Sequence, residues 1–291
     1  MATDQSKRVR RITDSIISLP TLPTVIAKML DLVDNPKTSA GSLSSLIMQD
    51  QVLTARILKL ANSSFYAFPR QISTVKLALV VLGFEAVKEM ALSLSVLNSF
   101  KGENNKNFDT SQFWHHSLAV GACSRMLARG ANHRLAGEAF VAGLLHDIGK
   151  LVLNQYLPEE FSEIQDRIWE RNQPCEEAEQ AVLGVTHAEV GAWLAERWNL
   201  PVTLVEAIRW HDHPEACPRN PELSLLVYLS DYLAARCALG RSGSKGVESL
   251  PPAVEGMART LFSLTPESLE AHRAELYAEY DKASSFMIEA A

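Results

Sequence analysis

The chain has 291 residues, of which 47% are hydrophobic and 21% are charged, and its formal net charge is −6. These values are ordinary for a globular protein of one large domain or two. The acidic balance argues against nucleic acid as a partner, and no apolar stretch is long enough to cross a bilayer. The four cysteines form no C-x-x-C pair and no signal-peptide pattern is found, so we expect reduced thiols, a cytoplasmic location and no membrane partner.

The first hundred residues show the spacing of amphipathic helices. Apolar residues recur every three to four positions in "TVIAKMLDLV", "QVLTARILKLA" and "FEAVKEMALSLSVLNSF", and strand-like alternation is scarce. A polar break, "KGENNKNFDTSQ", follows near residues 101–112. We therefore expect an N-terminal helical lobe over residues 12–100.

The helical pattern continues in a second lobe, expected over residues 108–240. Its predicted helices lie near 112–130, 135–156, 159–172, 187–199, 201–211 and 222–239. A loop rich in Gly, Ser and Pro, "LGRSGSKGVESLPP", then precedes a charged helical extension at 250–291. The predicted fold class is all-α, in two helical lobes.

The stretch "GLLHDIGK" places four residues on the face opposite its apolar stripe, namely Gly143, His146, Asp147 and Lys150. A face turned to water is one interpretation. A solvated face usually carries Glu, Lys and Gln, however, whereas alanines and a glycine border this one. Small residues indicate close packing, which favours a buried functional site.

The preceding helix, "QFWHHSLAVGACSRMLAR", contains two adjacent histidines. His116 lies in line with the apolar residues of this helix, and His115 lies at the edge of that face. If one of the two binds a metal, we expect it to be His116. The alternative is a core histidine that donates a hydrogen bond to a backbone carbonyl.

Three further inward polar residues follow along the chain. Thr186 begins a capping-box pattern, so His187 opens the next helix and heads its apolar stripe. His211 ends the apolar row of a later helix, and His213 lies just past that helix end. Asp231 stands in the apolar stretch "LSLLVYLSDYLAA" and needs a partner from another helix.

Four inward histidines and two inward aspartates are more than the four ligands of a structural zinc site. Imidazole and carboxylate favour Fe or Mn, with Ni or Zn as alternatives, so we expect one or two divalent transition metals. Two metals that share a carboxylate can activate water for attack on a phosphate. The six candidate ligands are His116, His146, Asp147, His187, His211 and Asp231.

The order H…HD…H…H…D resembles the HD superfamily of metal-dependent phosphohydrolases. "HHSLAVGACSRMLA" and "FVAGLLHDIGKLVL" look like the first two motifs of its HD-GYP branch, the cyclic-di-GMP phosphodiesterases. The resemblance implies that His116, His146, Asp147 and Asp231 hold one metal, with Asp147 bridging to a second metal held by His187 and His211. It also implies that Asp147 and Lys150 act in catalysis, with Lys150 near the substrate phosphate.

The sequence departs from that branch after His211. It reads "WHDHPEACPRNPE", where the branch has a second adjacent histidine, a glutamate and a Gly-Tyr-Pro segment. We therefore do not expect cyclic-di-GMP hydrolysis, and His213 stays an alternative ligand.

The first lobe resembles the HDOD domain through its "LPTLP" start, "ILKLANSSFY" and final "LG", which occur in that order. With the HD motifs, the resemblance covers roughly residues 15–240. It implies a bacterial signal-transduction regulator with a signalling protein as partner, and most members have lost several HD ligands. Here every principal ligand position is filled. We favour a regulator with a retained metal site, and the alternative is an active phosphohydrolase that binds a nucleotide or another phosphate ester.

Overall fold

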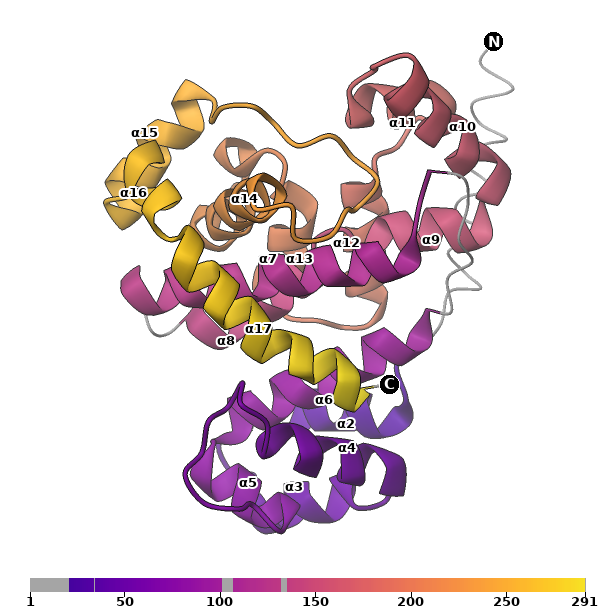
Figure 1. Ribbon diagram of the computed structural model, residues 1–291. Coiled ribbons are helices and arrows are strands. Elements are labelled where there is room, and N and C mark those ends of the chain that lie inside the picture. The colour runs from indigo at the N-terminus through magenta and orange to yellow at the C-terminus, as the bar shows by residue number, and fades with distance from the viewer. Residues whose placement is uncertain (1–20, 34, 101–106, 132–134, 291) are drawn as a thin grey trace. The chain divides into compact units, whose positions relative to one another are not determined.

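The computed structural model describes residues 21–33, 35–100, 107–131 and 135–290, and its side chains as far as residue 284. Within these ranges the chain forms helices joined by turns and loops, with no β-strand, which confirms the all-α prediction (Figure 1). It divides into two compact units, residues 21–100 with 277–290, and residues 107–276. The predicted limits of the lobes stay predictions, because residues 12–20 and 101–106 lie outside the described ranges.

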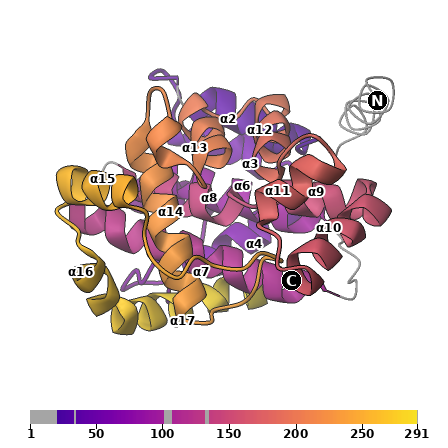
Figure 2. The same cartoon turned by 90° about the horizontal axis from the view of Figure 1, so that it is seen from above.

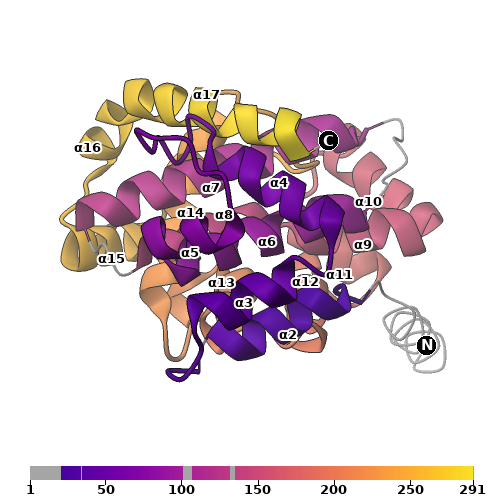
Figure 3. The same cartoon turned by 90° about the horizontal axis from the view of Figure 1, so that it is seen from below.

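The N-terminal unit is a small helical bundle in which α2 and α3 pack side by side (Figure 3). Polar side chains cap three of its helices, since the side chains of Ser39, Asp50 and Thr74 each accept a hydrogen bond from the first turn. Its helices are α2 (Thr24–Val33), α3 (Ala40–Ile47), α4 (Gln51–Ala61), α5 (Val75–Val81) and α6 (Phe84–Ser99).

The C-terminal unit holds the longer helices, with α7 packed against both α8 and α14. The boundary between the units falls within the last helix, α17 (Arg273–Ala290). The other helices are α7 (Thr110–Ala131), α8 (Ala136–Leu145), α9 (Ile148–Tyr156), α10 (Pro158–Glu170), α11 (Cys175–Val182), α12 (His187–Arg197), α13 (Val202–Trp210), the 3₁₀ turn η2 (Pro214–Ala216), α14 (Pro221–Arg236), α15 (Pro252–Phe262) and α16 (Pro266–Ala271). None of the described helices is long and apolar enough to cross a membrane.

The prediction of one continuous helix over residues 135–156 is wrong. The chain turns at His146 and Asp147, where α8 ends and α9 begins, and Asp147 has φ −96° and ψ 9°. Each half packs on a different helix, as α8 packs on α7 and α9 on α12. The residues on both sides of the turn are buried, so the spacing of apolar residues does not reveal the change of direction.

Glycines permit the close packing that the small residues around "GLLHDIGK" predicted. A methyl group at Gly143 would lie 2.8 Å from the backbone of Gly121 in α7. A methyl group at Gly149 would overlap the carbonyl oxygen of His187 in α12. The helices that carry the candidate ligands therefore approach one another almost backbone to backbone.

Candidate metal centre

Five parts of the C-terminal unit bring the six predicted ligands together. They are the middle of α7, the α8–α9 junction, the start of α12, the end of α13 and the middle of α14. The four histidines and Asp147 are at most 3% exposed, so the interpretation of a water-facing polar stripe is wrong. The ligands in chain order are His116, His146, Asp147, His187, His211 and Asp231.

A first group contains His116, His146 and Asp231, whose ligand atoms lie within 4.8 Å of one another. His116 Nε2 lies 2.8 Å from Asp231 Oδ1, so this aspartate finds the partner that its apolar helix requires. His146 Nδ1 donates to the Gly143 carbonyl over 2.7 Å. Because that carbonyl can only accept, the Nε2 atom of His146 presents its lone pair to the group.

A second group contains His187 and His211, whose Nε2 atoms lie 3.3 Å apart. His211 Nδ1 donates to the Ile208 carbonyl over 2.8 Å, and His187 Nδ1 donates to the Glu179 carboxylate over 2.9 Å. Burial lowers the pKa of His187, but the negative charge of Glu179 and the hydrogen bonds to Asp147 and Cys175 together raise it well above its usual value. Both rings are thus held with Nε2 directed into the cluster.

The Asp147 carboxylate lies between the two groups and directs one oxygen to each. Its Oδ1 atom is 3.1 Å from His187 Nε2 and 3.5 Å from His211 Nε2, whereas Oδ2 is 3.3 Å from His146 Nε2. Burial raises the pKa of Asp147, but the neighbouring His146 ring, the Lys150 ammonium and hydrogen bonds to the histidines together lower it well below its usual value. An ionised carboxylate with this placement has the geometry of a bridging ligand.

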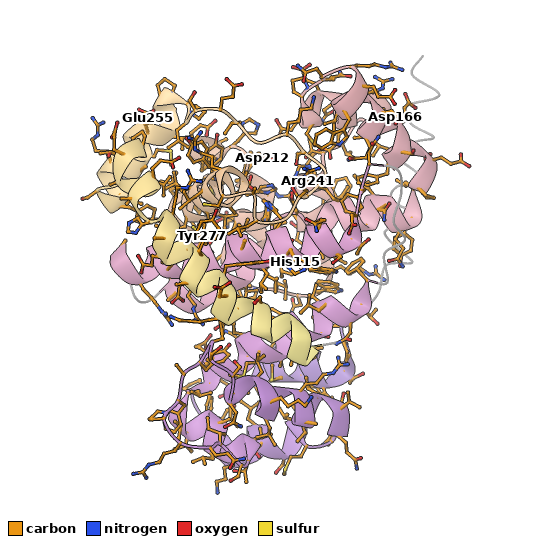
Figure 4. The ribbon with its side chains drawn as sticks, in the orientation of Figure 1. His115, Asp166, Asp212, Arg241, Glu255 and Tyr277 are labelled. Carbon is orange, nitrogen blue, oxygen red and sulfur yellow. The ribbon has the colours of Figure 1, made fainter. Side chains whose placement is uncertain are left out.

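Asp212 also lies at the second group and was not among the predicted ligands. Its Oδ2 atom is 3.4 Å from Nε2 of both His187 and His211, and its side chain is 33% exposed (labelled in Figure 4). His213 turns away, with Nε2 2.7 Å from Glu176, and is 51% exposed. The signal for Asp212 was available, since it occupies the position where the resembled branch has its second adjacent histidine.

Glu179 was also missed, together with its helix α11. The residue is fully buried and accepts hydrogen bonds from both the ring and the backbone N–H of His187, the latter over 3.0 Å. The weak pattern "CEEAEQAV" hid the helix, although Glu179 shares its inner stripe with Cys175 and Val182 at helical spacing. A carboxylate on an apolar stripe was the sign that could have found it.

Several buried atoms of the cluster lack a hydrogen bond. Both ring nitrogens of His116, Nε2 of His146 and Oδ1 of Asp147 are inaccessible to water and have no well-aligned partner. An unsatisfied buried polar atom costs about 1–3 kcal/mol. A divalent cation would satisfy the inward-facing nitrogen and oxygen atoms, so the residues present fit a metal.

The cluster divides into two similar donor sets that share Asp147. One set adds His116, His146 and Asp231, and the other adds His187, His211 and Asp212. Each set thus has two imidazoles and one carboxylate of its own, a donor set that suits Fe, Mn, Ni or Zn. The two unshared carboxylates are about one third exposed (33% and 35%), so they mark the open side of the cluster.

Lys150 lies beside the bridging carboxylate and is only 2% exposed. Its Nζ atom donates to Asp147 Oδ2 over 2.7 Å and to Ser244 Oγ over 2.6 Å. Burial lowers the pKa of the ammonium, but the carboxylates of Asp147 and Asp212 and the hydrogen bond to Asp147 together raise it above its usual value, so the lysine stays protonated. A fixed positive charge therefore stands next to the candidate metal positions.

This is an all-helical protein whose C-terminal unit gathers histidines and aspartates into one cluster. A comparison with protein families gives a more specific assignment. A family model described as the HDOD domain matches residues 19–214, which is more than half of the chain. The chain therefore belongs to the HDOD domain family.

Two curated relatives are similar over part of their length. An uncharacterized protein of Treponema pallidum is 27% identical over 221 residues, which are 76% of this chain and 42% of that protein. Ribonuclease Y of Petrotoga mobilis is 29% identical over 199 residues, which are 67% of this chain and 31% of that enzyme. The chain thus spans less than half the length of these curated relatives.

Solved structures share the fold over almost the whole chain. An HDOD domain protein of Geobacter sulfurreducens has a TM-score of 0.76 at 27% identity, with 97% of both chains covered. A candidate phosphohydrolase of Shewanella amazonensis has a TM-score of 0.73 at 24% identity, with 95% of this chain and 97% of that chain covered.

Proposed function

We propose that this protein is an HDOD regulator of bacterial signal transduction that binds a phosphoryl-bearing ligand at a centre of two divalent metals. One observation carries the proposal: Oδ1 of Asp147 faces His187 and His211, whereas Oδ2 faces His146. That is the arrangement expected of a carboxylate shared by two ions. Most members of the resembled family lack several of these ligands, whereas this chain has all of them.

The chain's own residues would bind and orient such a ligand. The metals would supply Lewis-acid attraction for phosphoryl oxygens and would lower the pKa of bound water. The Lys150 ammonium adds a point charge that attracts the same oxygens. Asp212 and Asp231 are the partly exposed members of the cluster, so a ligand would approach between them.

A second candidate function is hydrolysis of a phosphate ester, and the complete ligand set favours it. Ribonuclease Y, a partial relative, is by its name an enzyme that cleaves RNA. We rank hydrolysis second, because the Gly-Tyr-Pro segment of the phosphodiesterase branch is absent. A cytoplasmic location and a signalling protein as partner remain part of the proposal.

Metal analysis followed by titration separates these functions. We expect about two ions of Fe or Mn per chain, and heat on calorimetric titration of the loaded protein with inorganic phosphate or nucleotides. Turnover of bis-p-nitrophenyl phosphate by the loaded protein would move the assignment to the hydrolase. A protein that takes up no divalent metal would rule out both functions.

A further inference from the structure

The segment Gly240–Gly246, with the sequence "GRSGSKG", follows α14 and crosses the C-terminal unit to α10 (Figures 1 and 2). Its start is fixed on α7, where the Arg241 N–H donates to the Gln112 carbonyl over 3.1 Å. Its far end is fixed beyond α10, where Lys245 Nζ donates to Asn172 Oδ1 over 2.6 Å and lies 5.5 Å from the Trp169 ring centroid. The segment is therefore anchored at both ends, and its middle contacts Lys150 beside the candidate metal centre.

Two glycines let this segment approach the core closely. Gly240 has φ +74°, and a methyl group there would overlap the backbone nitrogen of His116. Gly243 has φ +81°, and a methyl group there would lie 2.9 Å from the Phe108 ring. Because both conformations are unfavourable for other residues, the backbone path depends on glycine. This path directs the serines on either side of Gly243 inward.

Those two serines hold the Lys150 ammonium. An ammonium has three N–H donors, and Lys150 Nζ has three acceptors, namely Asp147 Oδ2 at 2.7 Å, Ser244 Oγ at 2.6 Å and Ser242 Oγ at 3.4 Å. A buried charge needs such partners. The carboxylate can fix only one of the three directions, so the serines fix the others.

The serine hydroxyls can donate hydrogen bonds as well as accept them from Lys150. Each Oγ accepts from Lys150 through a lone pair, and because the two Oγ atoms lie 3.4 Å apart, one hydroxyl can donate to the other while the remaining O–H stays available to a ligand. A phosphoryl oxygen next to Lys150 would accept such a bond. The pair therefore complements an anionic, acceptor-rich ligand better than a cation or an apolar group.

We propose that Ser244, assisted by Ser242, is a positioning residue that fixes Lys150 for recognition of a phosphoryl group at the metal centre. The inference rests on the proposed phosphoryl-binding function. It adds that the "GRSGSKG" segment, which lies beyond the matched family region, determines how well the site binds phosphate. The competing view is that the serines only stabilise a loop.

A double-mutant cycle tests the proposal on the full chain loaded with Mn, with inorganic phosphate as the probe. We expect Ser244→Ala to weaken phosphate binding about tenfold, in keeping with loss of a hydrogen bond to a charged group. Lys150→Met should weaken it at least as much, and Ser244→Ala added to Lys150→Met should weaken it no further. Ser244→Thr, which keeps the hydroxyl, should keep the wild-type phosphate affinity. Ser249→Ala, at an exposed position of the same loop, should leave the phosphate affinity unchanged.

The outcomes distinguish this inference from the function beneath it. If Lys150→Met weakens binding and Ser244→Ala does not, the positioning role is wrong and the phosphoryl site stands. A lower melting temperature of Ser244→Ala with unchanged phosphate affinity would likewise overturn it. If the loaded wild-type protein binds no phosphate, both the function and the positioning role are wrong. Metal content measured in every variant ensures that lost binding is not lost metal.

Discussion

The two units each contain an aspartate at the N-cap of a helix, and the two aspartates are used differently. In the N-terminal unit, Asp50 accepts a hydrogen bond from Leu53 N over 2.9 Å and caps its own helix, α4. In the C-terminal unit, Asp147 stands at the N-cap of α9 but makes no capping bond, and its carboxylate faces histidines and a lysine. Of these two N-cap aspartates, the one that makes no capping hydrogen bond is therefore the one whose side chain serves another purpose.

The same difference extends to neighbouring helix ends. The α3 and α5 N-caps, Ser39 and Thr74, bond within their own helices. By contrast, His146 ends α8 and His211 ends α13, and both direct a ring nitrogen into the candidate metal centre. These polar helix ends of the N-terminal unit serve local stability, whereas the C-terminal unit, although Thr186 and Thr265 cap their own helices, uses the helix ends at His146, Asp147 and His211 to assemble the candidate centre.

Replacement of Asp147 should give the largest effect. Asp147→Ala removes the shared carboxylate and leaves the buried Lys150 ammonium without its charged partner, which costs about 3–5 kcal/mol of unfolding free energy. Metal content should fall for both ions, because each donor set loses a ligand. Elemental analysis and denaturant unfolding measure the two losses. Unchanged metal content and stability would show that the cluster is not a metal centre.

Replacement of Asp212 should affect one donor set only. Asp212→Asn weakens the set around His187 and His211, so we expect about one metal per chain in place of two. His213→Ala is the matched control, since that ring pairs with Glu176 outside the cluster. If His213→Ala lost metal and Asp212→Asn did not, the choice between these neighbours would be reversed.

Replacement of Glu179 should weaken metal binding without removing a ligand. Glu179→Ala frees the His187 ring to rotate, and loss of such an orienting carboxylate lowers metal affinity about 10–100-fold. Glu176→Ala, on the same helix and partly exposed, is the control. Competition with a chelator measures both affinities, and equal affinities in the two variants would contradict an orienting role for Glu179.

Replacement of Asp50 should have the smallest effect and no influence on metal. Asp50→Ala removes one helix cap, which costs about 1 kcal/mol. Denaturant unfolding checks the stability, and elemental analysis should find the wild-type metal content. Loss of metal from this variant would contradict the division of roles between the two aspartates.

Most helices could be predicted from the sequence because their apolar stripes repeat at helical spacing. The capping box at Thr186 is present, and it places His187 as the first residue of α12, as predicted. The turn at Asp147 could not be predicted, because the helical spacing of the sequence continues through it and the residues on both faces are buried. Helix α11 was missed because eight residues with three glutamates give too weak a stripe.

The candidate ligands were predictable one at a time, since each polar residue stood out on an apolar face. Their grouping was expected only from the resemblance to the HD superfamily, because spacing along one helix says nothing about the distance between helices. Asp212 and Glu179 had weaker signals, since Asp212 lies just past a helix end and Glu179 lies on a short stripe among other glutamates. Ser242 and Ser244 lie in a loop whose path depends on glycine conformations, so sequence periodicity carries no information about their contact with Lys150.

The contact of Gly149 with the His187 carbonyl has a consequence for how this protein tolerates variation. A side chain at position 149 would move α12 away from α9, and with it one histidine away from Asp147, although every ligand would be intact. At most positions a substitution by alanine removes contacts, but at position 149 the added methyl group would overlap the backbone of α12. A random-mutagenesis screen for metal-deficient protein should therefore recover changes at this glycine alongside changes at the histidines.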